Sequence, residues 1–280
     1  MGGSVGGSGA IDLHSHSLAS DGQFPPAEVA ARARAAGCSV WALCDHDTVA
    51  GLEAAAAAAR EVNVRFVPGI ELSAFLERHE IHLLGHFVDP ASPALRAFED
   101  FLAARRRERM AQIVERLAAL GVHVTAAAIV AHSGGKTIGR PHVARAIVES
   151  GAVATIKEAF DRYLGEGQPA YVQRYRLEAV DAVALVRGAG GTVTIAHPGV
   201  SKLEVGEVAR LAAAGVAGIE VIHPDQNPSV REKYRRAAQE HGLVCTAGSD
   251  YHGPDVSPDR HLGMVSMTPE GLEALERRRP

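Results

Sequence analysis

The 280-residue sequence contains few cysteines, few aromatic residues and no long apolar segment. Its three cysteines, Cys38, Cys44 and Cys245, have no paired spacing, which excludes a disulfide framework and is typical of a reducing compartment. No apolar run approaches the roughly 20 residues that a membrane-spanning helix needs. The first residues also lack the charged and apolar parts of a signal peptide. We therefore expect a cytoplasmic protein with no membrane association.

Basic residues are not in excess either. The chain has 29 Lys and Arg against 33 Asp and Glu, so its formal net charge is −4. A global positive field that recruits nucleic acid is thereby excluded, and any contact with RNA must be local. The basic run over 105–109 lies among acidic residues at 99, 100 and 115, a pattern that favours a solvated helix face.

Apolar, strand-like segments alternate with helical segments along most of the chain. The expected strands cover 11–14, 40–44, 65–67, 81–84, 192–196, 218–222 and 243–246, with 265–267 as a candidate for a last strand. Repeated strand–helix units imply a parallel sheet, and a chain of this length favours a barrel. The predicted fold class is therefore α/β.

The middle of the chain departs from that alternation. Residues 91–167 carry helical patterns and almost no strand signal; the expected helices cover 95–120, 140–149 and 156–164. We predict a small helical domain inserted into a barrel that is formed by residues 11–90 and 168–280. The Gly- and Ser-rich residues 1–10 are expected to be a disordered lead-in.

Histidine is abundant, with 14 residues, and two of them form the most informative motif. His14 and His16 follow a short apolar run, and side chains at positions i and i+2 of a strand point to the same side. Two imidazoles placed in this way can hold one metal ion.

Further metal-ligand residue types stand at or near other apolar runs. They are Asp21, His46, Glu71, His82, His197, Asp250 and His252. In a parallel barrel the carboxyl ends of all strands open on one face, so these side chains should converge. A mixed imidazole and carboxylate set suits Mn, Fe or Zn. Nine candidate ligands exceed the needs of one ion, so we predict two or three ions that share a bridging carboxylate, an arrangement suited to phosphoester hydrolysis.

Each candidate also has a structural alternative. Asp21 and His197 are compatible with turns, and His82 with a core histidine. Asp45 and Asp47 flank His46 and are not predicted as ligands, although one of them could orient that histidine. His223 follows the strand at 218–222, where a structural role and a substrate contact are about equally expected.

The motifs taken together resemble the PHP (polymerase and histidinol phosphatase) family of metal-dependent phosphoesterases. The matching segments are Asp12-Leu13-His14-Ser15-His16, Ser20-Asp21-Gly22, Asp45-His46-Asp47, Gly69-Ile70-Glu71, Ala196-His197-Pro198-Gly199 and Ser249-Asp250-Tyr251-His252. The resemblance implies a distorted (β/α)7 barrel with three metal sites. It assigns His14, His16, Glu71 and Asp250 to a first group of ligands. The second group is the bridging Glu71 with His82 and His197, and the third is Asp21, His46 and His252.

A closer similarity is to one subgroup, the nucleoside 3′,5′-bisphosphate phosphatases related to the exoribonuclease RNase AM. It rests on residues 45–52, 80–82, 139–142 and 163–172. This similarity implies removal of the 3′-phosphate from nucleoside 3′,5′-bisphosphates, with trimming of short 5′-phosphorylated RNA from its 5′ end as a further activity. Two alternatives are a phosphatase for another small phosphomonoester, such as a histidinol phosphate-like compound, and a non-catalytic nucleotide-binding module. The expected partner is a small nucleotide or short RNA, and no obligate protein partner is evident.

The expected chemistry is attack on phosphorus by a hydroxide that bridges two metal ions. We predict Glu71, Asp250 and His252 as catalytic residues, while the leaving-group acid is either a metal-bound water or a carboxyl such as Asp45 or Asp47. A guanidinium beside a helix start is a good phosphate cradle. We therefore predict that Arg140 and His142, next to Pro141, hold a substrate phosphate. The structural alternatives are a surface arginine and a helix-capping histidine.

Overall fold

The computed structural model describes residues 9–133 and 139–280. The chain forms two compact units, Met1–Arg96 with Arg176–Pro280, and Ala97–Tyr175. The predicted boundaries of the insertion, 91 and 167, stay predictions; helix α3 (Pro93–Ala119) begins just before the second unit. Most of the predicted lead-in lies outside the described residues, and Ala10 already belongs to the first strand.

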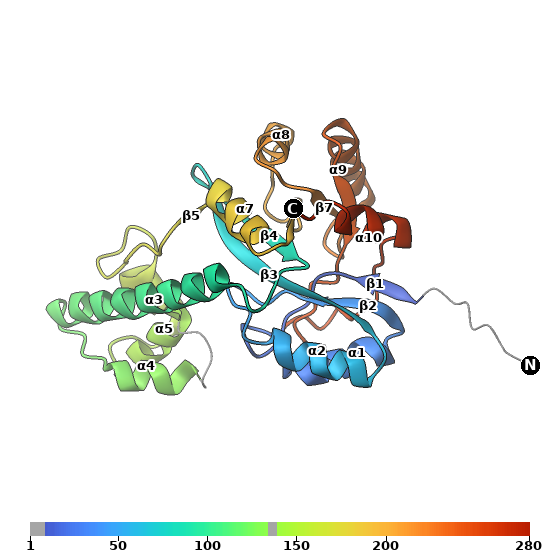
Figure 1. Ribbon diagram of the computed structural model, residues 1–280. Coiled ribbons are helices and arrows are strands. Elements are labelled where there is room, and N and C mark those ends of the chain that lie inside the picture. Colours follow the sequence, from blue (N-terminus) through green and yellow to red (C-terminus); the bar gives the residue numbers. More distant parts are fainter. Residues whose placement is uncertain (1–8, 134–138) are drawn as a thin grey trace, which may run out of the picture. The chain divides into compact units, whose positions relative to one another are not determined.

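The first unit is built on one mixed sheet (Figure 1). Its strands are β1 (Ala10–Asp12), β2 (Cys38–Leu43), β3 (Arg65–Leu76), β4 (His79–His86), β5 (Leu177–Glu178), β6 (Thr192–Ile195), β7 (Gly218–Ile222) and β8 (Val244–Ala247). Their order is β1-β2-β3-β4-β6-β7-β8, and β5 pairs with β3. The predicted α/β class is confirmed.

One strand reverses the expected all-parallel arrangement. Strand β4 pairs antiparallel with both β3 and β6, whereas β1–β2–β3 and β6–β7–β8 are parallel. His82 lies opposite Ser73 in the middle of β4, so it does not reach the site from a strand end. It shares a face of the hairpin with Glu71 because side chains alternate along each strand.

The two edge strands of the sheet are linked by backbone hydrogen bonds. The amide of Leu13 donates to the carbonyl of Ala247 at 3.1 Å, and the amide of His16 donates to Tyr251 at 2.8 Å. A parallel bridge also pairs Ser15 with Tyr251. These contacts follow the strand ends, and they bring the motif around His14 beside the motif around Asp250.

Helices of the first unit mostly connect successive strands. They are α1 (Pro26–Ala35), α2 (Leu52–Glu61), α7 (Ala179–Gly188), α8 (Val205–Ala213), α9 (Pro228–Glu240) and α10 (Pro269–Glu276). The expected strand over 265–267 is wrong: these residues make only two hydrogen bonds to Ile11, one from the amide of Met267 and one to the hydroxyl of Ser266. Two isolated bonds do not make a ladder.

The second unit is helical. It contains most of α3, with α4 (Ala126–Ser133), α5 (Arg140–Glu149), α6 (Ile156–Ala159) and the π-helix η1 (Phe160–Leu164). Its core is formed by Ile113, Leu117, Ile129, Val143, Ile147 and Leu164, with smaller neighbours. Because this core is separate from the apolar core of the sheet, each unit buries its own apolar residues. In the described residues no helix is long and apolar enough to span a membrane.

Candidate metal centre

Glu71 stands at the centre of the ligand-type side chains. It is fully buried in β3, and five imidazoles surround its carboxylate. Oε2 lies 3.2 Å from His14 Nε2, 3.1 Å from His16 Nε2 and 3.3 Å from His46 Nδ1. Oε1 lies 3.0 Å from His82 Nδ1 and 3.1 Å from His197 Nε2. One carboxylate therefore faces two separate sets of nitrogen atoms, one with each oxygen.

The first group converges on Oε2. His14 Nε2 lies 3.1 Å from His16 Nε2, and Asp250 Oδ1 lies 3.4 and 3.2 Å from these two nitrogens. Bonds of about 2.0–2.2 Å from a common ion to its ligands place neighbouring ligand atoms roughly 3 Å apart. The four side chains thus have the mutual spacing of ligands around one ion.

His46, a member of the third group, also lies beside the second. One ring nitrogen each of His46 and His82 and an oxygen of Glu71 lie within 4.8 Å of one another. His46 Nε2 also lies 3.9 Å from Asp21, whose other oxygen is 3.3 Å from His252 Nε2. The structure therefore brings all nine predicted ligands together, while it places His46 between two groups.

Protonation of the centre follows from its crowding. Burial disfavours charge on His16, but hydrogen bonding to the carboxylates of Asp250 and Glu71, which accept from the imidazole, outweighs it and raises the pKa of His16 to about 10. Burial alone would raise the pKa of Glu71, yet the imidazoles of His46, His14 and His82 lower it well below the usual value. At His46 burial prevails and lowers the pKa to about 4.

These groups fit divalent metal ions. The buried Nδ1 atoms of His46 and His82 lie close to Glu71 but make no hydrogen bond in acceptable geometry within the described residues. His252 Nδ1 donates to the carbonyl of Asp250 at 2.9 Å, and its Nε2 lies 3.3 Å from Asp21 Oδ1. Imidazole nitrogens fixed in this way, among buried carboxylates, are the donor set of a metal centre. Metal binding would replace the protons held by His14 and His16.

Asp45 holds the loop that carries Asp21. Its carboxylate accepts hydrogen bonds from the amide of Ser17 and from the hydroxyls of Ser17 and Ser20, each at 2.7 Å. Asp47 accepts from the amide of Ser73 at 3.1 Å. Both carboxylates thus hold backbone segments next to ligands, a use that differs from donation of a proton to a leaving group.

Three residues that the sequence analysis missed or left open surround the ligands. Glu220 in β7 contacts His14. Arg260 donates to Oδ2 of Asp250 at 2.5 Å, and His223 Nε2 lies 3.4 Å from the same oxygen. Nδ1 of His223 accepts the amide of Asp225, so its Nε2 carries the proton. A glutamate inside an otherwise apolar strand was a usable signal for Glu220, whereas Arg260 lies in an irregular loop that carries no such pattern.

Backbone strain coincides with the ligands. His197 has φ of 24° and Asp250 has φ of 51°, values in the left-handed region that favours glycine. Residues held there cost on the order of 1–3 kcal/mol and persist where the surroundings fix them, commonly at functional sites. The two strained residues follow β6 and β8, and each presents its side chain to the groups defined above.

Cys44 directly follows β2 and does not belong to the groups of ligand-type residues. Its thiol is buried and donates to the carbonyl of Leu13 at 3.4 Å. Burial raises the pKa of this thiol, so it stays protonated. Within the described residues, the groups that could hold a metal ion contain no cysteine, so their donors are imidazoles and carboxylates.

The predicted substrate contacts lie in the second unit. Arg140 begins α5 and donates to the carbonyl of Leu164 at 3.3 Å. Nδ1 of His142 accepts the amide of Gly139 at 2.9 Å, which is a helix-capping interaction. This nitrogen is engaged in the cap, as the structural alternative for His142 expected; a phosphate contact by either residue stays a prediction.

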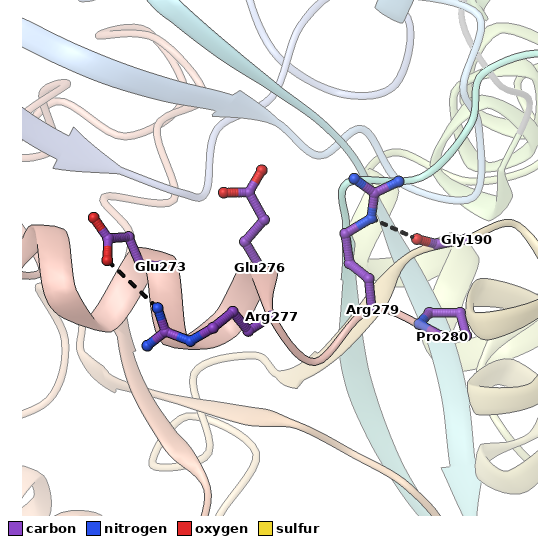
Figure 2. Close-up of a pocket in the computed structure, with 6 residues that line it drawn as sticks. All are labelled: Gly190, Glu273, Glu276, Arg277, Arg279 and Pro280. Carbon is purple, nitrogen blue, oxygen red and sulfur yellow. Dashed lines mark hydrogen bonds and ion pairs between the residues drawn. The ribbon is translucent and has the colours of Figure 1, made fainter.

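A separate pocket of about 540 Å³ is lined by Gly190, Glu273, Glu276, Arg277, Arg279 and Pro280 (Figure 2). Gly190 precedes β6, whereas His197 follows the other end of that strand, so the pocket is remote from the metal centre. Arg279 donates to the carbonyl of Gly190 at 3.0 Å and Glu273 pairs with Arg277 (Figure 2). Glu276 pairs with Arg65 at 2.7 Å, so each charged side chain of the pocket already has a partner in the protein.

An α/β sheet whose strands and the segments after them gather imidazoles and carboxylates around a shared glutamate defines a metal-dependent hydrolase. The family model for the PHP domain matches residues 12–162. The chain belongs to the PHP family.

Relatives of known activity support this assignment. A 3′,5′-nucleoside bisphosphate phosphatase from Chromobacterium violaceum is 39% identical over 249 residues, 87% of each chain. A 5′-3′ exoribonuclease from Haemophilus influenzae is 36% identical over 252 residues, 87% of this chain and 90% of the relative. The solved structure of an amidohydrolase from Chromobacterium violaceum, with bound sulfate and no metal, superposes with a TM-score of 0.76 at 36% identity and 96% coverage of both chains.

Proposed function

We propose that this protein is a metal-dependent phosphoesterase that hydrolyses the 3′-phosphate of nucleoside 3′,5′-bisphosphates. The observation that carries the proposal is the convergence of eight imidazole and carboxylate residues around Glu71 in a chain similar to the Chromobacterium violaceum phosphatase. Similarity to the Haemophilus influenzae exoribonuclease favours a second activity, 5′→3′ trimming of short 5′-phosphorylated RNA.

The proposed cofactor is a set of two or three divalent ions, with Mn preferred and Fe or Zn as alternatives. When bound, such ions supply a hydroxide nucleophile near neutral pH and neutralise the phosphoryl oxygens. The first group would be held by His14, His16, Glu71 and Asp250. The second group would be Glu71, His82 and His197, and the third Asp21, His46 and His252.

Burial indicates the side from which substrate approaches. The side chains of His14 and His16 are 0% exposed, whereas those of His46 and His82 are 25% exposed and that of Asp21 is 55% exposed. A phosphate would therefore meet the second and third groups first. His14 and His16 lie behind them, where water is excluded and their geometry is fixed by packing.

The remaining residues would orient the ligands. Arg260 and His223 both bind Oδ2 of Asp250, which leaves Oδ1 directed at His14 and His16. Among the proposed catalytic residues, Glu71 and Asp250 would fix the ligand geometry and His252 would present Nε2 beside Asp21. Arg140 and His142 are proposed to bind the phosphate that is not hydrolysed.

The test is a substrate comparison with Mn-loaded protein. Adenosine 3′,5′-bisphosphate, AMP, histidinol phosphate and a short 5′-phosphorylated RNA would be incubated separately, and release of phosphate or nucleotide followed. The proposal expects fastest phosphate release from the bisphosphate, with the 5′-phosphate retained in the product. Preferential hydrolysis of histidinol phosphate would favour a phosphatase of another class. If none of the substrates is hydrolysed, a non-catalytic binding module would be favoured.

Arg140→Ala tests the phosphate contact, with Arg145→Ala on the exposed side of the same helix as the matched control. Loss of one charge-assisted hydrogen bond, worth about 1.5–3 kcal/mol, should raise KM for the bisphosphate roughly 10- to 100-fold. AMP, which lacks the second phosphate, would serve as the comparison ligand. Unchanged kinetics in Arg140→Ala would refute the contact.

A further inference from the structure

Glu220 is a buried carboxylate that lies outside the three groups of proposed ligands. It occupies the middle of β7 and is 1% exposed. Its Oε1 lies 3.2 Å from His14 Nδ1, and its Oε2 accepts the backbone amide of His197 at 2.8 Å. These two residues belong to different groups, because His14 is in the first and His197 in the second.

Burying the carboxylate of Glu220 would cost free energy if these two contacts were absent. Its neighbours Ile219 and Val221 are fully buried, and burying a carboxylate in an apolar strand is unfavourable without compensating hydrogen bonds. The described side-chain contacts of Glu220 all go to His14 and His197. The charge is therefore satisfied by two residues of the metal centre.

The contact with His14 fixes its ring. A carboxylate accepts but does not donate, so His14 Nδ1 carries a proton directed at Glu220 and Nε2 faces Glu71 and Asp250. A carboxylate bound to the far nitrogen of a ligating histidine sets its tautomer and increases its basicity.

The contact with His197 is to the backbone. His197 has φ of 24°, and the hydrogen bond from its amide to Glu220 holds this strained conformation. Gln226 supports the same turn, since its amide group donates to the carbonyl of Glu220 while its Oε1 accepts the amide of Gly199 at 2.7 Å.

The neighbouring strand confines Glu220. A Cβ atom placed on Gly248, directly after β8, would lie 2.3 Å from Glu220 Oε1 and 2.2 Å from His14 Cβ. Only glycine permits this approach. The carboxylate and the histidine are thus packed against backbone and held together.

We propose that Glu220 is a positioning residue that links the first and second groups of ligands without being a ligand itself. Its one carboxylate fixes both the ring of His14 and the backbone of His197. It complements Glu71, which faces both groups from inside. This inference rests on the proposed metal centre and goes beyond the ligand assignment.

Glu220→Gln tests the coupling, because the amide retains the shape but has only one acceptor oxygen for two donors. Thr246→Val is the matched control: Thr246 lies directly opposite Glu220 in the sheet, is equally buried, and its hydroxyl has no hydrogen-bond partner within the described residues. Each protein would be stripped with chelator and titrated with Mn²⁺ by equilibrium dialysis. The thermal midpoint of the stripped protein would be recorded separately.

The proposal expects Glu220→Gln to weaken Mn²⁺ binding roughly 10- to 100-fold, with Thr246→Val like the wild type. Excess Mn²⁺ should restore occupancy. If the thermal midpoint of the metal-free variant falls while its Mn²⁺ affinity is unchanged, Glu220 has a merely structural role and the proposal is overturned. If Glu220→Gln does not fold, Glu220→Asp, whose shorter side chain reaches only one partner, should show the same loss of affinity, and wild-type affinity there would also overturn it. A wild-type protein that binds no Mn²⁺ would instead remove the metal centre itself.

Discussion

Replacing Glu71 with glutamine perturbs the two carboxylate oxygens that the first and second groups share. The change keeps the volume of the side chain but removes a negative charge that faces five imidazoles. The amide is neutral, so neither set of nitrogens keeps an anionic oxygen, and the set that faces the NH2 group also loses its acceptor. Breaking a buried charged network at one partner costs roughly 3–5 kcal/mol.

That free energy sets the expected size of the effect. At about 1.4 kcal/mol for each factor of ten, metal affinity should fall roughly a hundred- to several thousand-fold. The assay would measure the metal content of protein equilibrated with buffered Mn²⁺, together with phosphate release from adenosine 3′,5′-bisphosphate. Glu53→Gln on the exposed surface of α2 makes the same chemical change away from the centre. A Glu71→Gln protein with wild-type metal content and activity would refute the role of Glu71 as the shared ligand.

Two further substitutions test the surroundings of the centre. Asp45→Asn removes one acceptor from the loop that carries Asp21. The metal affinity of the third group should therefore fall roughly 10- to 100-fold in the same dialysis assay, while the first group stays filled. Equal loss of metal from both groups would contradict this. His86 is buried, and burial lowers its pKa from 6.5 to about 4. Between these two values the unfolded chain binds a proton at His86 and the folded chain does not. Wild-type stability should therefore decrease as the pH falls below 6.5, by about 2 kcal/mol at pH 5 from this group alone. His86→Gln should lack that contribution in urea unfolding at pH 7.5 and pH 5 in chelator, and an identical pH dependence of the two proteins would disprove the assignment.

The sequence predicted the α/β class and most strand positions because apolar runs ended at turn residues. It did not reveal that β4 runs backwards. The β3–β4 hairpin is joined by Glu77 and Arg78, with φ of 57° at Glu77, and this pair lacks the Asn-Gly or Asp-Gly signal of a two-residue turn. Periodicity alone cannot give the direction of a strand, so the sequence predicted a parallel sheet.

The ligand-type residues were predictable because they belong to short motifs, such as His14-Ser15-His16. Their supporting residues were harder to find. Arg260 reaches Asp250 from an irregular loop ten residues later, and nothing in its local pattern indicates that contact. His46 lies between two groups, which is a fact of three-dimensional spacing that no linear order contains.

The ligand groups of the described residues contain no cysteine, and this has a consequence for which metal the centre would bind. Sulfur ligands would discriminate in favour of soft ions, but imidazoles and carboxylates bind first-row divalent ions in an order where Cu²⁺ and Zn²⁺ exceed Mn²⁺. Affinity alone therefore does not select Mn²⁺. The ions recovered with purified protein would record which metals were available in the expressing cells, so activity is meaningful only after chelation and reloading with a single, defined ion.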